Sequence, residues 1–215
     1  MILHLETATK VCSVAISDKG NLLTLIEENS AEYSHSENLN LFIEKALKNT
    51  NLSLKKIDAI SVSAGPGSYT GLRIGVSTAK GLCYALDKPL ISVGALISIA
   101  AQIKDKYPKN KFCPMIDARR MEVFSSIYDQ DMTIIKPISA DIIEENSYED
   151  FGEFVAAGDG VQKLKEVWKN RNEIIFDEEI LSSAKGQVSI AWDKFQKNEF
   201  EDVAYFEPFY LKDFK

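Results

Sequence analysis

Short runs of apolar residues separated by polar turns occupy most of this chain, and the spacing within the runs changes along it. In the first half, β-branched runs predict strands, whereas apolar residues spaced three and four apart predict helices. Residues 18–21 (Asp-Lys-Gly-Asn) predict a tight turn between the second and third strands. The predicted order is strands 1–6, 11–17 and 22–27, helix 36–48, strand 57–62, helix 70–86, strand 89–93 and helix 95–104.

The second half repeats this order of elements without an obvious repeat of residues. Its predicted elements are strands 112–116, 122–128 and 132–136, helix 140–146, strand 154–157, helix 162–169, strand 173–176 and helix 182–197. The charged segment 104–111, which contains Pro108, marks the predicted boundary between two lobes, 1–105 and 106–215. We therefore predict an α/β fold of two lobes, each a mixed sheet with helices, with a nucleotide-sized cleft between them. The pattern leaves open whether the last helix packs back on the first lobe.

The segment from Ser63 to Gly75 combines a strand end, a glycine-rich turn and a helix start. Such a loop presents backbone N–H groups to an anion such as phosphate. The P-loop pattern is excluded because no lysine follows the glycines, and the dinucleotide pattern is excluded because Thr70 stands where its third glycine belongs. A phosphate-binding loop and a tight turn without ligand both stay open.

The helix predicted over 70–86 has unusually little polar surface. From Leu72 onward its only charged residues are Arg73 and Lys80. A helix of this kind is usually buried on more than one side, and its small residues allow another helix to approach closely. The second cover is either the chain's own second lobe or a partner subunit.

Composition narrows the classes of function. Of the 215 residues, 45% are hydrophobic and 27% charged, as in an ordinary globular protein, and no run is long enough to span a membrane. Three scattered cysteines in apolar surroundings, and a first segment without signal-peptide character, predict a cytoplasmic location. The net charge of −7 opposes nucleic-acid binding by this chain alone. The basic spots are short, namely 104–111 and Arg119-Arg120.

Several motifs, taken together, resemble the TsaB (YeaZ) family over nearly the whole chain. The most specific is Gly65-Pro66-Gly67-Ser68-Tyr69-Thr70-Gly71-Leu72-Arg73-Ile74-Gly75. The supporting segments are Leu5–Thr9 followed by Cys12–Ala15, Ile116–Arg119 with Glu122–Phe124, Gly158–Gly160 and Glu207–Leu211. The resemblance implies an actin-like fold, of the sugar-kinase and ribonuclease H-like superfamily, with the two lobes that the repeated element order suggests.

The resemblance also implies a function and partners. Family members support the synthesis of N6-threonylcarbamoyladenosine at position 37 of tRNAs that read ANN codons. They bind the catalytic paralogue TsaD and work with the ATPase TsaE, and they form a homodimer when the partner is absent. The implied role is a non-catalytic scaffold that needs no cofactor of its own and meets tRNA only through the complex. ATP or ADP with Mg²⁺ at an interface of the complex is left open.

The resemblance suggests two sets of site residues. The partner surface is formed by the first two helices, and its predicted residues are Leu39, Phe42, Ile43, Arg73, Ile74, Ser77, Thr78, Gly81 and Tyr84. For Leu39, Phe42 and Ile43 the alternative is the lobe's own core, which must hold for at least one of them. The tentative nucleotide-binding residues are Glu6, Thr7, Thr9, Gly65, Gly67, Ser68, Gly71, Asp117, Gly158 and Gly160.

Catalysis by the chain itself is not expected. TsaD binds its metal through a His-x-x-x-His pair, whereas this chain has only His4 and His35, and Leu39 stands four residues after the latter. Actin-like ATPases, and many chains of the family, carry aspartate where Glu6 stands. The extra methylene displaces the carboxylate, and a displacement of about 1 Å can cost about a hundredfold in rate. The competing hypothesis is a free-standing nucleotide phosphotransferase that uses Glu6, Asp117 and the glycine loops.

Overall fold

The first of the two sheets in the computed structural model, which describes residues 1–29 and 35–212, is built from the first half of the chain. Its strands are β1 (Ile2–Glu6), β2 (Val11–Asp18), β3 (Asn21–Asn29), β4 (Ala59–Ser63) and β5 (Leu90–Val93). Their spatial order is β3-β2-β1-β4-β5, with β1, β4 and β5 parallel and β2 and β3 antiparallel to their neighbours. Every residue of β1, β4 and β5 is buried, because helices cover both faces of the sheet.

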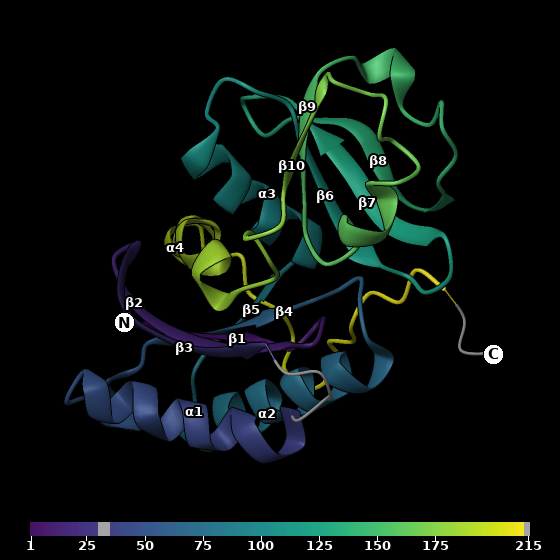
Figure 1. Cartoon of the computed structure of the whole chain (residues 1–215). Helices are drawn as coiled ribbons and strands as arrows, with labels where there is room; N and C mark the ends of the chain where they lie inside the picture. The colour runs from purple at the N-terminus through teal and green to yellow at the C-terminus, as the bar shows by residue number, and fades with distance from the viewer. Residues whose placement is uncertain (30–34, 213–215) are drawn as a thin grey trace.

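The helices explain this burial. The elements are α1 (His35–Asn49), η1 (Leu54–Lys56), α2 (Tyr69–Leu86) and α3 (Ala95–Lys106) in the first half, and η4 (Ala184–Gln187) and α4 (Val188–Gln196) near the end. Helices α1 and α2 lie side by side under one face of the first sheet, and α4 lies on the opposite face (Figure 1). In the latter contact Ala191 packs against Ile2, Ala59 and Ile91.

The second sheet repeats the first in strand number and type of order. Its strands are β6 (Phe112–Asp117), β7 (Glu122–Tyr128), β8 (Ile134–Ile142), β9 (Phe154–Ala157) and β10 (Ile174–Asp177). Their order is β10-β9-β6-β7-β8, and α3 lies between the two sheets (Figure 1). The predicted α/β architecture of two mixed sheets with helices is therefore confirmed. No helix in the described ranges combines the length and apolarity needed to cross a bilayer.

Three predicted helices of the second half are wrong or too long. Residues 140–146 begin as the end of β8, because pairing with β7 overrides their local preference. Residues 162–169 form a single 3-10 turn, η3 (Gln162–Leu164), followed by turns. The last helix is divided, since η4 precedes α4. A Cβ at Gly186 in η4 would lie only 2.2 Å from the carbonyl oxygen of Ser98, so this turn packs tightly on α3. A further 3-10 turn, η2, spans Glu149–Phe151.

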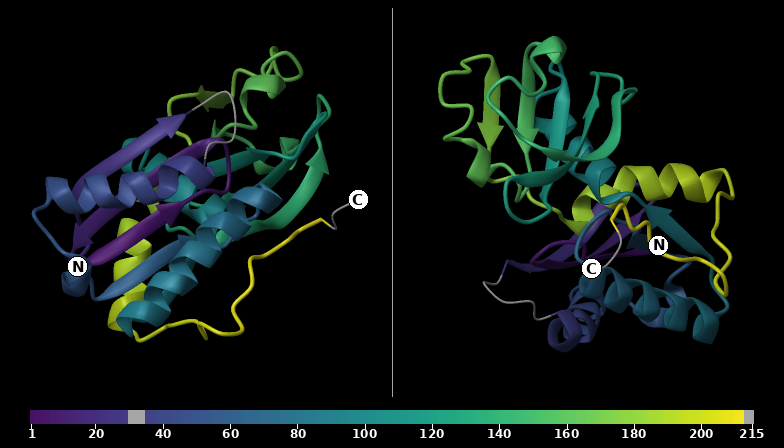
Figure 2. Two further views of the ribbon diagram at one scale, coloured as in Figure 1. Left: turned by 90° about the horizontal axis from the view of Figure 1, so that it is seen from below. Right: turned by 90° about the vertical axis from the view of Figure 1, so that its right-hand side faces the viewer.

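After α4 the chain runs in an extended strap, residues 197–212, which Figure 2 shows passing along α2. The Lys80 amine of α2 donates hydrogen bonds to the carbonyls of Ala204 (2.9 Å) and Phe206 (3.1 Å). The Tyr210 ring then meets the Tyr69 ring, with 4.8 Å between centroids. One of the two charges of α2 is thus used to hold the chain's own end.

Candidate functional site

The outer face of α1 and α2 carries a groove of about 470 Å³. It begins where both helices start and continues along the first turns of α2. Its lining residues are His35, Ser36, Leu39, Asn40, Tyr69, Thr70, Arg73, Ile74, Ser77 and Thr78. Five predicted partner residues therefore share one depression of the surface: Leu39, Arg73, Ile74, Ser77 and Thr78.

Helix α2 continues this face beyond the groove. Arg73, Ser77 and Gly81 are exposed and lie four residues apart, so they form one stripe along the helix. A Cβ at Gly81 would meet no atom within 4 Å, and Tyr84 beside the stripe is 87% exposed. Apart from the Arg73 guanidinium, which stacks 3.9 Å from the Tyr69 ring, the stripe carries no charge. The described residues of the chain leave this face of α2 uncovered.

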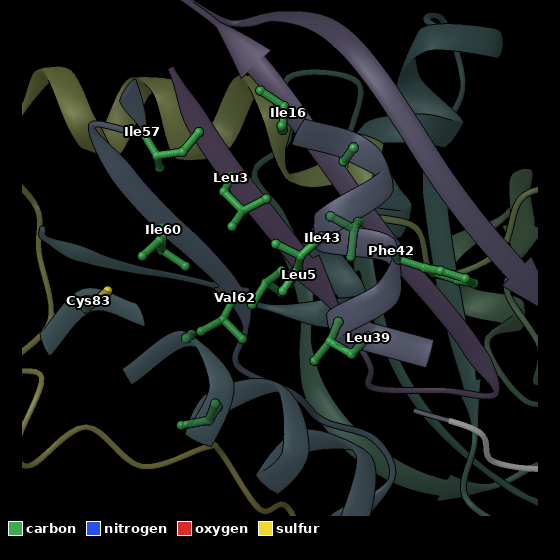
Figure 3. Packing of buried hydrophobic residues seen from close by; sticks show 14 of the residues in the cluster. Leu3, Leu5, Ile16, Leu39, Phe42, Ile43, Ile57, Ile60, Val62 and Cys83 are labelled. Carbon is green, nitrogen blue, oxygen red and sulfur yellow. The ribbon is translucent and has the colours of Figure 1, made fainter. Parts of the chain in front are cut away.

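Helix α1 contributes less surface than the sequence suggested. Leu39, Phe42 and Ile43 are 1%, 6% and 6% exposed and belong to the core beneath the first sheet. Figure 3 shows Ile43 and Leu39 on the side of α1 toward Leu5 and Val62, with the Phe42 ring pointing away from these two residues. The alternative of a core position therefore holds for all three, because the apolar stripe of an amphipathic helix faces its own sheet first. Leu39 still forms part of the groove wall, whereas Leu41 is the exposed apolar residue of α1, at 51%.

The glycine-rich loop makes its close approaches to its own chain. A Cβ at Gly67 would lie 2.3 Å from the carbonyl oxygen of Ala8, and one at Gly71 would lie 2.1 Å from that of Thr7. The Thr7 hydroxyl donates to the Gly71 carbonyl at 2.8 Å. The Ser68 side chain accepts from the Gly71 N–H and caps α2. These contacts explain Gly67 and Gly71 as packing positions against the β1–β2 connection, whereas a Cβ at Gly65 would meet the Phe209 carbonyl oxygen of the strap at 2.7 Å.

Glu6, at the end of β1, is completely buried. Its carboxylate accepts the Ala8 N–H at 2.8 Å, and Gln187 of η4 lies 3.4 Å away through its amide nitrogen. Gln187 also donates to the Leu5 carbonyl at 2.9 Å and accepts from the Ser61 hydroxyl at 2.7 Å. Burial raises the pKa of Glu6 above its ordinary value. Thr9 is likewise buried. The turn η4 therefore seals this end of the first sheet.

Asp117, the second predicted carboxylate, lies in a different environment. It ends β6 at the exposed β6–β7 connection and forms an ion pair with Lys163. Gly158 has φ +111° and would place a Cβ 2.1 Å from the Met115 carbonyl oxygen, and Gly160 packs against Ile116. The residues near the two carboxylates in sequence, Ala8 and Ile116, belong to one apolar cluster with Leu72 and Phe124. Apolar contacts between the two halves of the chain therefore lie close to both carboxylates.

Neither histidine forms part of a metal centre in the described structure. The His4 ring is 2.7 Å from the Ser17 hydroxyl, and burial lowers its pKa to about 3. The His35 ring is 2.7 Å from the Thr9 carbonyl, and burial lowers its pKa as well. Within residues 1–29 and 35–212, no three His, Cys, Asp or Glu side chains come close enough together to hold a metal ion.

The sequence interpretation missed two elements that shape the site. Gln187 closes over Glu6, and the strap of residues 197–212 borders α2. A single glutamine in a helical pattern did not indicate that Gln187 would cover Glu6. The sequence did contain a signal for the strap, namely Lys80 on an otherwise apolar helix. A half-buried lysine amine needs oxygen atoms as hydrogen-bond acceptors, and the strap supplies them.

Comparison with known proteins gives consistent matches. The family profile described as TsaD, tRNA N6-adenosine threonylcarbamoyltransferase, matches residues 27–214. The tRNA threonylcarbamoyladenosine biosynthesis protein TsaB of Escherichia coli is 30% identical over 98% of this chain and 94% of its own length. The structure of YeaZ from Pseudomonas aeruginosa superposes with a TM-score of 0.81 at 25% identity, covering 98% of this chain and 99% of that one.

A more distant structure extends the comparison of folds. The activator of the 2-hydroxyisocaproyl-CoA dehydratase from Clostridium difficile, with bound ADPNP, superposes with a TM-score of 0.57 over 94% of this chain and 98% of that one. Its sequence identity is only 11%, so the likeness concerns the fold alone. It places the two-sheet architecture among actin-like folds.

Proposed function

Because the chain belongs to the TsaB (YeaZ) family of tRNA threonylcarbamoyladenosine biosynthesis proteins, we propose that it acts there as a non-catalytic subunit. In this role it docks a TsaD-type catalytic chain through the outer face of α1 and α2. The complex works with a TsaE-type ATPase in the cytoplasm, and the same face forms a homodimer when the catalytic chain is absent.

The observation that carries the proposal is the uncovered stripe of α2. Its residues Arg73, Ser77 and Gly81 offer small side chains and one cation beside an existing groove. Small residues let a second helix approach to the 8–10 Å typical of packed helices. The paralogue shares the fold, so its equivalent helices can pack in the same way on this face, as in a pseudo-symmetric dimer.

The non-catalytic part of the proposal is supported by the state of the two carboxylates. Glu6 is sealed beneath Gln187, and Asp117 is paired with Lys163 at an exposed hairpin. Gly71 and Gly67 of the glycine-rich loop closely approach the backbone of Thr7 and Ala8. We therefore assign no cofactor to the chain itself, and propose that ATP or ADP with Mg²⁺, where the reaction needs them, is held at an interface of the complex.

Reconstitution tests this function. The chain is mixed with the TsaD-type and TsaE-type proteins of the same organism, and modification of an ANN-reading tRNA is followed with and without it. We expect a stable complex on size exclusion and modification that depends on the chain. Failure to form the complex, or robust Mg²⁺-ATP turnover by the chain alone, would contradict the proposal and favour a free-standing phosphotransferase.

A further inference from the structure

The loop between β6 and β7 places two arginines in an unusual backbone conformation. Arg119 and Arg120 have φ values of +70° and +49°, and both are exposed. Positive φ suits glycine and, less well, asparagine, whereas a long side chain adopts it at a cost. Successive positive φ values occur in the tight turns of antiparallel hairpins such as β6–β7, but glycine and asparagine usually occupy them, so two arginines in succession are unusual. Strain of this kind is a reason to look for a function of the side chains.

The four arginines of the chain are used in different ways. Arg73 stacks on the Tyr69 ring, and the buried Arg171 pairs with Glu173 at 2.7 Å. Arg119 and Arg120 form neither an ion pair nor a side-chain hydrogen bond with any residue in the described ranges. Their only polar contacts come from the backbone, such as the Arg119 N–H donated to Asp117 at 2.8 Å.

The acidic residues that flank this loop are already neutralised. Asp117 before the loop pairs with Lys163, and Glu122 after it pairs with Lys212 of the strap. Asp159, whose carboxylate accepts the Asp117 N–H, has its pKa raised by burial. The two guanidinium groups are therefore the uncompensated charges of the loop. This end of the molecule presents local positive charge although the whole chain carries −7.

We propose that Arg119 and Arg120 contact the phosphate backbone of tRNA while the chain is part of the modification complex. This inference rests on the proposed function, because the acidic chain needs a partner to hold most of the nucleic acid. Guanidinium groups bind phosphate with two parallel hydrogen bonds and keep their charge at all physiological pH values. Contacts of this kind orient the nucleic acid without reading its sequence.

The position of the loop agrees with this role. Lys212 ties the loop to the strap, and two residues earlier Tyr210 meets Tyr69 in the first turn of α2. The β6–β7 loop is therefore connected, through residues 210–212 of the strap, to Tyr69, which lines the groove where we propose that a TsaD-type chain docks. A tRNA held by the docked chain can reach this loop as well.

The test replaces both arginines with residues that the backbone prefers. Arg119→Asn/Arg120→Gly removes two charges and relieves the positive-φ strain, so the variant is expected to fold at least as well as the parent. Unmodified ANN-reading tRNA is titrated against the complex with the TsaD-type chain at several salt concentrations. We expect affinity to fall at least about tenfold near 0.1 M salt, and the slope of log K against log salt to decrease by about 1.5.

Two matched variants separate a local contact from a general charge effect. Lys55→Gln/Lys56→Gln removes an exposed basic pair on η1 and should leave affinity and slope unchanged. Arg119→Lys/Arg120→Lys keeps the charges and should retain most of the slope. Equal affinity for the parent and the Asn/Gly variant, or an equal loss in the η1 pair, would overturn the proposal. Absence of a complex with the parent chain on size exclusion is a different result, which refutes the proposed function itself.

Discussion

Replacing Gly81 with glutamate separates the stability of this protein from its partner binding. Gly81 lies in the middle of α2, and a side chain there would enter open space. It continues the exposed stripe begun by Arg73 and Ser77. The substitution therefore adds bulk and charge only where the proposed partner helix has to approach.

The expected effects on the free chain and on the complex have opposite signs. Glycine in a helix interior is about 1 kcal/mol less favourable than alanine, and glutamate is close to alanine. Gly81→Glu should thus stabilise the monomeric chain, measured at a concentration below that of the proposed homodimer, by roughly 0.5 kcal/mol, or about 1–2 °C in Tm for a domain of this size. In the complex, an uncompensated buried charge costs about 3–5 kcal/mol. This cost corresponds to a loss of affinity of more than about 100-fold.

The assay combines thermal unfolding of the free chain with calorimetric titration against the TsaD-type protein. Ser189→Glu is a charge-matched control, because Ser189 is an exposed helical residue of α4 on the other side of the first sheet. The control should bind as the parent does. If Gly81→Glu binds within about threefold of the parent, the α2 stripe is not the docking surface and the reasoning fails.

Three further predictions concern the core and the buried polar groups. Ile43→Ala should destabilise the chain by about 2–4 kcal/mol, seen as a lower Tm, because Ile43 lies in the core. Partner binding should be normal at temperatures where the variant stays folded, and a binding defect there would mean that Ile43 belongs to the interface. Glu6 has a pKa raised by burial, so its contribution to stability is present below its unfolded pKa and is lost as pH rises through its folded pKa. Glu6→Gln should therefore gain Tm relative to the parent as pH increases from about 5 to 8, and parallel Tm curves would contradict this. Gly71→Ala should lower the free energy of unfolding by about 2 kcal/mol or more, measured with denaturant, because its Cβ would meet the Thr7 carbonyl oxygen at 2.1 Å. An unchanged unfolding midpoint would mean that the β1–β2 connection moves to accommodate the added methyl group.

Local pattern was sufficient for most of the fold. The first-half strands and helices begin and end within a few residues of their predicted limits, because each has a clear period and explicit turn or capping residues. The predictions failed at 140–146 and 162–169, where helix-compatible residues are held in a strand and in turns by cross-strand pairing and by the burial of Leu164 and Trp168.

The candidate site was predictable only in outline. The low charge of α2 is visible in the sequence, whereas the exposed stripe of Arg73, Ser77 and Gly81 is seen only in the structure. The assignment of Leu39, Phe42 and Ile43 was less successful, since the helical period shows that these residues share a face but not what that face contacts. The glycine-rich loop was equally ambiguous, because a close approach to phosphate and one to backbone require the same residue.

The amino-acid sequence by itself determined most of the elements, the two mixed sheets and the sparsely charged helix, which follow from neighbouring residues and their spacing, and its motifs indicated the family. Only the tertiary structure decided that Gln187 covers Glu6 and that Lys80 donates hydrogen bonds to the strap. It also decided that Lys163 and Lys212 pair with Asp117 and Glu122, so that these carboxylates do not pair with Arg119 and Arg120. These are contacts between groups dozens of residues or more apart in the chain. Their formation depends on which surfaces the packed sheets and helices bring together, and no local preference encodes that.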